Sequence, residues 1–138
     1  MLFRKEIPPV TSIESIFIKV SGMRFRCEYE VSTKDGNAKI ELYQIKIRDK
    51  QDVRELEASA QMPLDEMLGL CNRCEIMRWD GFFGAHPKNV RDGEMFDLEA
   101  SLNGGVRVRA EGSANFPKHY NEFMHELDKT LRETAQGT

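Results

Sequence analysis

The sequence lacks the features that mark several classes of protein. Its 138 residues contain only three cysteines, an odd number, which argues against a disulfide framework and favours a reducing compartment. No apolar run approaches the roughly 18 residues that a membrane-spanning helix requires. The segment before Pro8 carries Arg4, Lys5 and Glu6 and has no apolar stretch typical of a signal peptide. We therefore expect a cytoplasmic protein without a membrane segment.

An excess of one charge is also missing. Twenty Lys and Arg residues are scattered among twenty-three Asp and Glu residues, and the formal net charge is −3. The chain therefore has no basic face that could neutralise a phosphate backbone. Nucleic acid is not expected as a partner.

Length and composition are those of an ordinary globular domain. The length is typical of a single domain, which we expect to cover residues 1–138. Hydrophobic residues make up 40% of the chain and charged residues 31%, unlike the composition of disordered proteins. The chain is expected to fold without a cofactor, a metal or a disulfide. Its ends, 1–12 and 133–138, are expected to be flexible.

Alternating apolar and polar residues predict strands near the N-terminus. In 15–20, Ile16, Ile18 and Val20 share one side of the chain. From 23 to 31, apolar residues alternate with Arg and Glu, so that one side of this strand is expected to pack inward and the other to face water. The pair Asp35-Gly36 then favours a tight hairpin turn.

A third strand follows this turn. Its residues Ile40 and Leu42 share one face, whereas Ile45 and Ile47 have the opposite parity. We therefore expect a bulge near Tyr43 that keeps all of them facing the core. A shorter fourth strand is predicted over 53–58.

The pattern changes to a helical period after Pro63. An apolar stripe at spacings of three and four predicts a first helix and consists of Leu64, Met67, Leu68, Cys71 and Cys74. Residues 80–93 are rich in Gly, Pro, Asn and Asp and predict a long exposed loop. Two strands joined by a turn are predicted over 96–100 and 106–110, and a last helix begins near Pro117.

The predicted order of elements is ββββαββα, without the βαβ alternation of parallel sheets. We therefore expect an α+β fold in which an antiparallel sheet of five to six strands packs against two helices. Exposed edges at 15–20 or 53–58 could pair with a second copy of the chain and give a homodimer.

Cys71 and Cys74 form a Cys-x-x-Cys motif, which occurs in redox pairs and as half of a zinc site. A zinc site would need two more ligands, which His86 with His119 or His125 could supply. The pair lies near the end of the predicted helix, where the helix dipole opposes a thiolate. Both cysteines also continue the apolar stripe, so core packing is the favoured interpretation.

Residues 78–87 gather the only Trp of the chain with two Phe, an Asp and a His. The candidate binding residues are Trp79, Asp80, Phe82, Phe83 and His86, because exposed aromatics on a loop can form a binding rim. The favoured alternative is that Trp79 and Phe82 pack under the sheet and pin the loop. Asp80 and His86 could also form an acid–base pair, although no nucleophile pattern stands beside them.

Several short motifs follow one another in the C-terminal half. Trp79-Asp80-Gly81-Phe82 is followed by a strand, a turn, Gly112-Ser113 and then Phe116-Pro117-x-x-Tyr120 at the start of a helix. This arrangement, from the first predicted helix to Leu131, resembles a small module found in many uncharacterised bacterial proteins. That family has no assigned activity, so the resemblance implies a fold unit and a bacterial origin.

These observations lead to one functional hypothesis and two alternatives. We expect a non-catalytic domain that binds another protein or a peptide, or that associates with a second copy of itself. The binding surface is expected in the loop 79–87 or on the exposed face of the strands. The alternatives are a thiol or zinc protein that uses Cys71 and Cys74, with His86 as a further ligand, and a small hydrolase or isomerase that uses Asp80 and His86.

Overall fold

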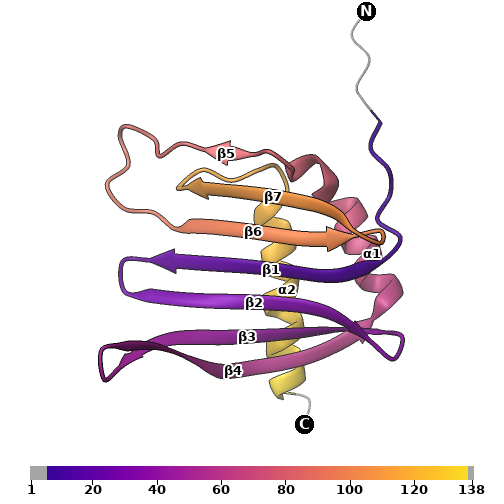
Figure 1. Ribbon diagram of the computed structural model, residues 1–138, viewed down its shortest axis with the longest axis horizontal. Coiled ribbons are helices and arrows are strands. Elements are labelled where there is room, and N and C mark those ends of the chain that lie inside the picture. The colour runs from indigo at the N-terminus through magenta and orange to yellow at the C-terminus, as the bar shows by residue number, and fades with distance from the viewer. Residues whose placement is uncertain (1–5, 137–138) are drawn as a thin grey trace, which may run out of the picture.

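One mixed β-sheet takes its strands from both halves of the chain (Figure 1). The computed structural model describes residues 6–136. The strand order across the sheet is β4-β3-β2-β1-β6-β7-β5, and all neighbours are antiparallel except β5 and β7. In chain order the elements are β1 (Ile13–Gly22), β2 (Phe25–Lys34), β3 (Asn37–Arg48), β4 (Gln51–Pro63), α1 (Leu64–Arg73), the 3-10 helix η1 (Ile76–Trp79), β5 (Phe83–Gly84), β6 (Met95–Leu102), β7 (Val106–Ser113) and α2 (Tyr120–Gln136).

Both helices lie on the same face of the sheet (Figure 1). Helix α2 crosses behind the strands from β7 toward β4, and α1 lies beside it. The alternating strands turn their apolar residues toward these helices, so that a single core forms between the two layers. Its largest fully buried side chains include Ile16, Ile18, Ile40, Met67, Trp79, Leu98, Phe123 and Leu127. Neither helix in the described part of the chain is long and apolar enough to cross a bilayer.

The α+β class with two helices is confirmed, and the structure corrects the details of the sheet. It has seven strands instead of five to six, and it is mixed instead of antiparallel. The difference comes from β5, whose two residues fall within the predicted loop 80–93 and pair in parallel with β7. The observed order is therefore ββββα, then η1, then βββα. The prediction missed β5 because a strand of two residues leaves no periodic signal in the sequence.

The structure also corrects one of the predicted edges. The strand predicted at 15–20 is β1, which lies in the centre of the sheet between β2 and β6, so the prediction of a free edge there is wrong. The strand predicted at 53–58 belongs to β4, which lies at the edge of the sheet. Strand order depends on contacts between segments far apart in the chain, and the local pattern of β1 does not contain them.

A register shift between β3 and β4 occurs at Leu42 and Tyr43, close to the predicted bulge. The extra residue belongs to β4, because Leu42 pairs with Ala58 and Tyr43 with Leu56, which leaves Glu57 unmatched. Strand β3 keeps its own alternation, so Ile45 and Ile47 point away from the helices, and Ile47 is 74% exposed. The prediction that they face the core is therefore wrong.

Two asparagine side chains hold the segment before β1 against the rest of the protein. The Asn103 Oδ1 accepts hydrogen bonds from the N–H groups of Thr11 at 2.7 Å and Ser12 at 3.2 Å. Asn72 bonds to both backbone groups of Val10, at 2.7 Å and 3.1 Å, and Val10 is buried. Of the ends expected to be flexible, 1–5 and 137–138 lie outside the described residues, and α2 continues to Gln136.

Two glycines provide a test of how tightly the chain is packed. A Cβ on Gly112 would collide with the carbonyl oxygen of Asn115, whereas a Cβ on Gly69 in α1 would meet no atom within 4 Å. We expect Gly112→Ala to lower the free energy of unfolding by about 1–3 kcal/mol. Gly69→Ala should raise it by about 0.5–1 kcal/mol, because alanine is the better helix former. Urea unfolding measures both, and equal stabilities of the two variants would contradict this packing.

Candidate functional site

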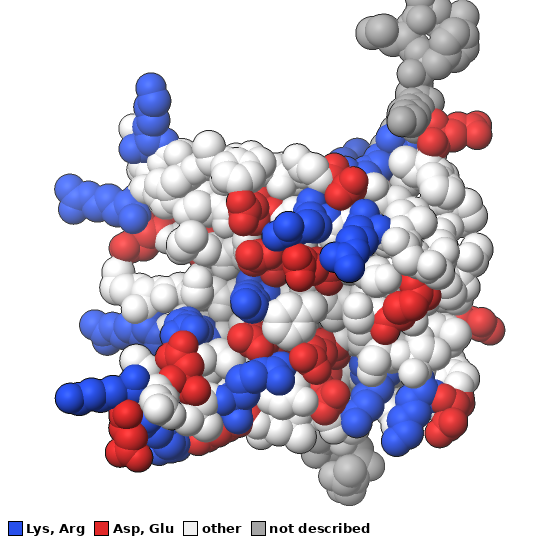
Figure 2. Space-filling model, in the orientation of Figure 1, with Lys and Arg blue, Asp and Glu red and all other residues white. Residues whose placement is uncertain are grey.

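The face of the sheet opposite the helices carries the polar sides of the alternating strands (Figure 2). Charges of both signs are interleaved over this open face. The register of the sheet brings one side chain from every strand into a single row across it. From β5 to β4 this row consists of Phe83, Glu111, Asp97, Lys19, Glu28, Tyr43 and Leu56.

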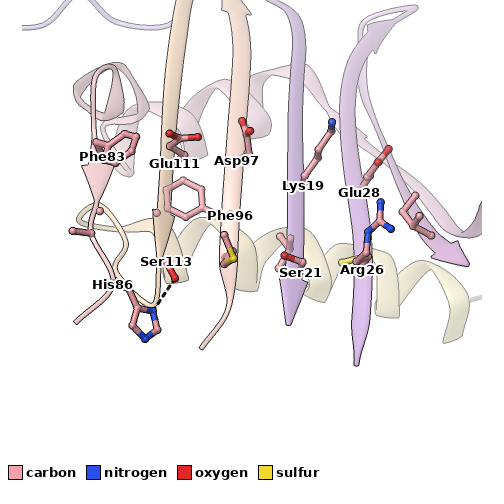
Figure 3. Close-up of a pocket in the computed structure, with 17 residues that line it drawn as sticks. Lys19, Ser21, Arg26, Glu28, Phe83, His86, Phe96, Asp97, Glu111 and Ser113 are labelled. Carbon is pink, nitrogen blue, oxygen red and sulfur yellow. Dashed lines mark hydrogen bonds between the residues drawn. The ribbon is translucent and has the colours of Figure 1, made fainter. Parts of the chain in front are cut away.

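A hollow of about 460 Å³ lies on this face, where β1 and β7 end and β2 and β6 begin (Figure 3). We call it the open-face hollow. Its lining combines the apolar side chains of Ile45, Phe83 and Met95 with polar ones that include Lys19, Arg26, Glu28, His86, Asp97, Glu111 and Ser113. Phe83 is 75% exposed and Met95 is 54% exposed. Ligand sites in proteins commonly measure roughly 300–1,000 Å³.

Two charged residues of the open-face hollow are held in ion pairs with β4. Arg26 donates hydrogen bonds to both carboxylate oxygens of Asp52, at 3.1 and 2.9 Å, and these bonds lower the pKa of Asp52 below its usual value. Arg54 donates a hydrogen bond of 2.7 Å to Glu28, and its guanidinium lies 3.9 Å from the centroid of the Tyr43 ring. The β2 side of the hollow is thus electrostatically satisfied.

Two other carboxylates of the hollow have no such partner. Asp97 and Glu111 are a direct cross-strand pair of β6 and β7. Within residues 6–136, neither carboxylate forms a hydrogen bond or an ion pair. Lys19 lies opposite Asp97 on β1, and its ammonium is placed over the Phe17 ring, 5.7 Å from the centroid. Like charges directly opposite one another in a sheet are destabilising, so this pair favours a positively charged neighbour.

The Trp79-Asp80-Gly81-Phe82 segment closes the outer edge of β7. The Asp80 Oδ1 accepts a hydrogen bond from the N–H of Arg109 at 3.0 Å, and the Gly81 N–H donates to the Arg109 carbonyl at 2.8 Å. The Phe82 carbonyl accepts a hydrogen bond from the N–H of Glu111 at 3.1 Å. Gly81 has a φ of +82°, a conformation that glycine adopts without strain. The motif therefore replaces a neighbouring strand along β7 until β5 begins.

Of the predicted binding residues, Phe83 and His86 line the open-face hollow. Trp79 is 2% exposed, packs edge-on against Phe123 and donates from Nε1 to the Lys118 carbonyl at 3.0 Å. Phe82 packs against the core. The structure thus agrees with the interpretation in which Trp79 and Phe82 pin the loop, and Trp79 is not part of an exposed rim.

Asp80 and His86 are not brought together. Asp80 bonds to Arg109, whereas the His86 Nδ1 lies 2.8 Å from the Ser113 Oγ. These two β7 residues are roughly 13 Å apart at the usual rise of a strand. The His86 Nε2 contacts the Val90 carbonyl, so in the neutral ring this nitrogen carries the proton and Nδ1 accepts from the Ser113 hydroxyl. Each side chain fixes a part of the loop, and the two do not form an acid–base pair.

Cys71 and Cys74 are free thiols buried in the core, as the apolar stripe predicted. Burial raises the pKa of Cys71 to about 12 and that of Cys74 to about 11, which disfavours the thiolate that redox and metal chemistry require. Across the described residues, no three His, Cys, Asp or Glu side chains are grouped to hold a metal ion, so His86 does not join the two cysteines. Asn72, between them, instead bonds to Val10.

The residues that complete the hollow were not among the predicted site residues. Alternation indicates that Met95, Asp97 and Glu111 point away from the core. It does not indicate that these three lie beside Phe83, because the parallel pairing of β5 with β7 decides that neighbourhood. The local signal for the hollow was the charged residues on the polar sides of β6 and β7.

Strand β4 forms the other edge of the sheet. It contains the bulge at Glu57, carries the charges of Arg54 and Glu55 and ends at Pro63. Bulges, charges and prolines are features that oppose pairing of an edge with another chain. Association of two copies through 53–58 stays a prediction.

No protein-family model matches the chain, and comparison with curated proteins finds no match either. The resemblance of the C-terminal half to a bacterial module stays a prediction that rests on its motifs.

Burial of the thiols gives a test of the cysteine alternative. We expect Cys27, Cys71 and Cys74 to react with a thiol reagent at about pH 8 only after the protein is denatured, because their raised pKa values and burial suppress the thiolate. Titration of the native and the denatured protein measures this difference. A native thiol that reacts as fast as a free cysteine would return the Cys-x-x-Cys to consideration as a redox site.

The β7 edge gives a second test. Asp80→Ala removes the acceptor of the Arg109 N–H and should lower the free energy of unfolding by about 1 kcal/mol, the usual contribution of one hydrogen bond. Asp80→Asn keeps an oxygen acceptor and should lower it less. Urea unfolding of the two variants compares them. An alanine variant as stable as the parent would show that this hydrogen bond does not secure the edge.

Proposed function

We propose that this chain is a non-catalytic protein-binding domain that holds a segment of a partner protein in the open-face hollow. One observation carries the proposal: two large apolar side chains, Phe83 and Met95, are exposed in the lining of one hollow on the sheet face opposite the helices. Apolar groups exposed next to one another and rimmed by polar residues are typical of sites where proteins bind.

The position of the hollow supports this proposal. Its floor is formed by paired strands, which hold side chains in fixed positions, whereas one wall comes from the loop after β5. His86 ties that loop to the end of β7 through Ser113. A rigid floor with a loop at its rim is a common arrangement of recognition sites. Phe83 lies on β5 itself, so the aromatic anchor is also fixed by backbone pairing.

A peptide selection tests the proposal. Random peptides displayed on phage are selected on the purified protein, and the enriched peptides are then measured on Phe83→Ser and Met95→Ser. Both side chains are exposed, so the free energy of unfolding should change by less than about 0.5 kcal/mol. Affinity for the enriched peptides should fall by about tenfold or more, as expected for the anchor residues of an interface.

Ile47→Ser is the matched control. Ile47 is as exposed as Phe83, but it does not line the open-face hollow. Its replacement should leave peptide affinity unchanged. Peptides that bind the Phe83→Ser and Met95→Ser proteins as tightly as the parent would overturn the proposal.

A further inference from the structure

We propose that the segment bound in the open-face hollow presents an arginine, whose guanidinium lies between Asp97 and Glu111 and against the Phe83 ring. This inference rests on the proposed function and adds the chemistry of the occupant. It explains a feature of the sheet that the fold does not require, namely two neighbouring carboxylates that form no hydrogen bond or ion pair within residues 6–136.

The first argument is the distance between the carboxylates. Asp97 and Glu111 are directly opposite on neighbouring antiparallel strands. Such pairs have Cβ atoms about 4.5–5.5 Å apart, so one planar guanidinium can reach both side chains. Their mutual repulsion destabilises the free protein, and a cation between them removes it. The free energy of binding a cation is therefore more favourable here than at a single exposed carboxylate.

The second argument is charge complementarity. Arg26 and Glu28, which also line the hollow, are already bound to Asp52 and Arg54. Of the remaining charged residues of its lining, Lys19 is positive, and Asp97 and Glu111 are negative. The groups without an ion pair therefore have a net negative charge, which favours a basic occupant.

The third argument distinguishes arginine from lysine. Phe83 is next to Glu111 in the row across the sheet, and Figure 3 shows Phe83, Glu111 and Asp97 side by side. A guanidinium stacks on an aromatic ring and donates hydrogen bonds to carboxylates in its own plane, a geometry that a lysine ammonium does not offer. Met95, two residues before Asp97 on β6, offers an apolar surface for the residue beside the arginine.

The test uses the peptide most enriched in the selection. It is synthesised in two forms, one with its arginines and one in which citrulline, the neutral analogue, replaces them. On the parent protein we expect the arginine peptide to bind about tenfold more tightly than the citrulline peptide. On the double variant Asp97→Asn, Glu111→Gln the two peptides should bind equally. Isothermal titration calorimetry measures the four affinities.

Glu99→Gln is the control variant. Glu99 lies on the same strand and the same face as Asp97, but it pairs with Arg109 and does not line the hollow. This variant should still bind the arginine peptide about tenfold more tightly than the citrulline peptide. Free arginine amide serves as a second probe. If arginine amide binds as tightly as the peptide, the occupant is a small molecule, and the proposal that a protein segment supplies the arginine is overturned.

The two proposals fail in different ways. Enriched peptides that depend on Phe83 but lack a basic residue, or that bind the citrulline form equally well, would overturn the arginine inference and leave the protein-binding function standing. Enriched peptides that do not depend on Phe83 would overturn the protein-binding function itself.

Discussion

The pairing of β1 with β6 is the contact on which the rest of the structure depends. It joins the four strands at the N-terminus to the strands that follow the first helix, so that Ile18 lies beside Leu98 and Val20 beside Phe96. Because β1 also pairs with β2, its two faces are fixed from both sides. Its apolar face then lies under the helices, and Lys19 takes its place in the row of charged side chains on the open face.

The one-sided arrangement of the helices explains the contrast between the two faces. The covered face buries a continuous apolar core, closed by Trp79 where it meets Phe123 and by the hydrogen bond from the Tyr29 hydroxyl to Asp128 on α2. Within residues 6–136 no helix covers the open face, and its charged side chains instead pair with one another across the strands, as Arg54 does with Glu28. The hollow on this face is open to solvent, and Phe83 and Met95 in its lining are exposed.

The two edges of the sheet are protected by different means. At β4 the edge is long and carries a bulge and charges. At β7 the edge is covered by Asp80, Gly81 and Phe82, which bond to its backbone, and by the short strand β5. The same segment that closes this edge also places Phe83 on the open face. The Trp-Asp-Gly-Phe motif is thus a structural element, and it positions the side chain on which the proposed site depends.

Local signals in the sequence predicted most of the secondary structure of this protein. Periods of two and of three to four residues indicated β1, β2 and both helices, and Asp35-Gly36 indicated a hairpin, because these signals depend on neighbours in the chain. The apolar stripe of the first helix also predicted that Cys71 and Cys74 lie in the core. Only the tertiary structure decided that β1 is central, that Ile47 faces solvent and that Phe83, Asp97 and Glu111 share one hollow. Those facts follow from strand order and register. Both are set by contacts between distant segments of the chain and by the burial of apolar side chains on one face of the sheet.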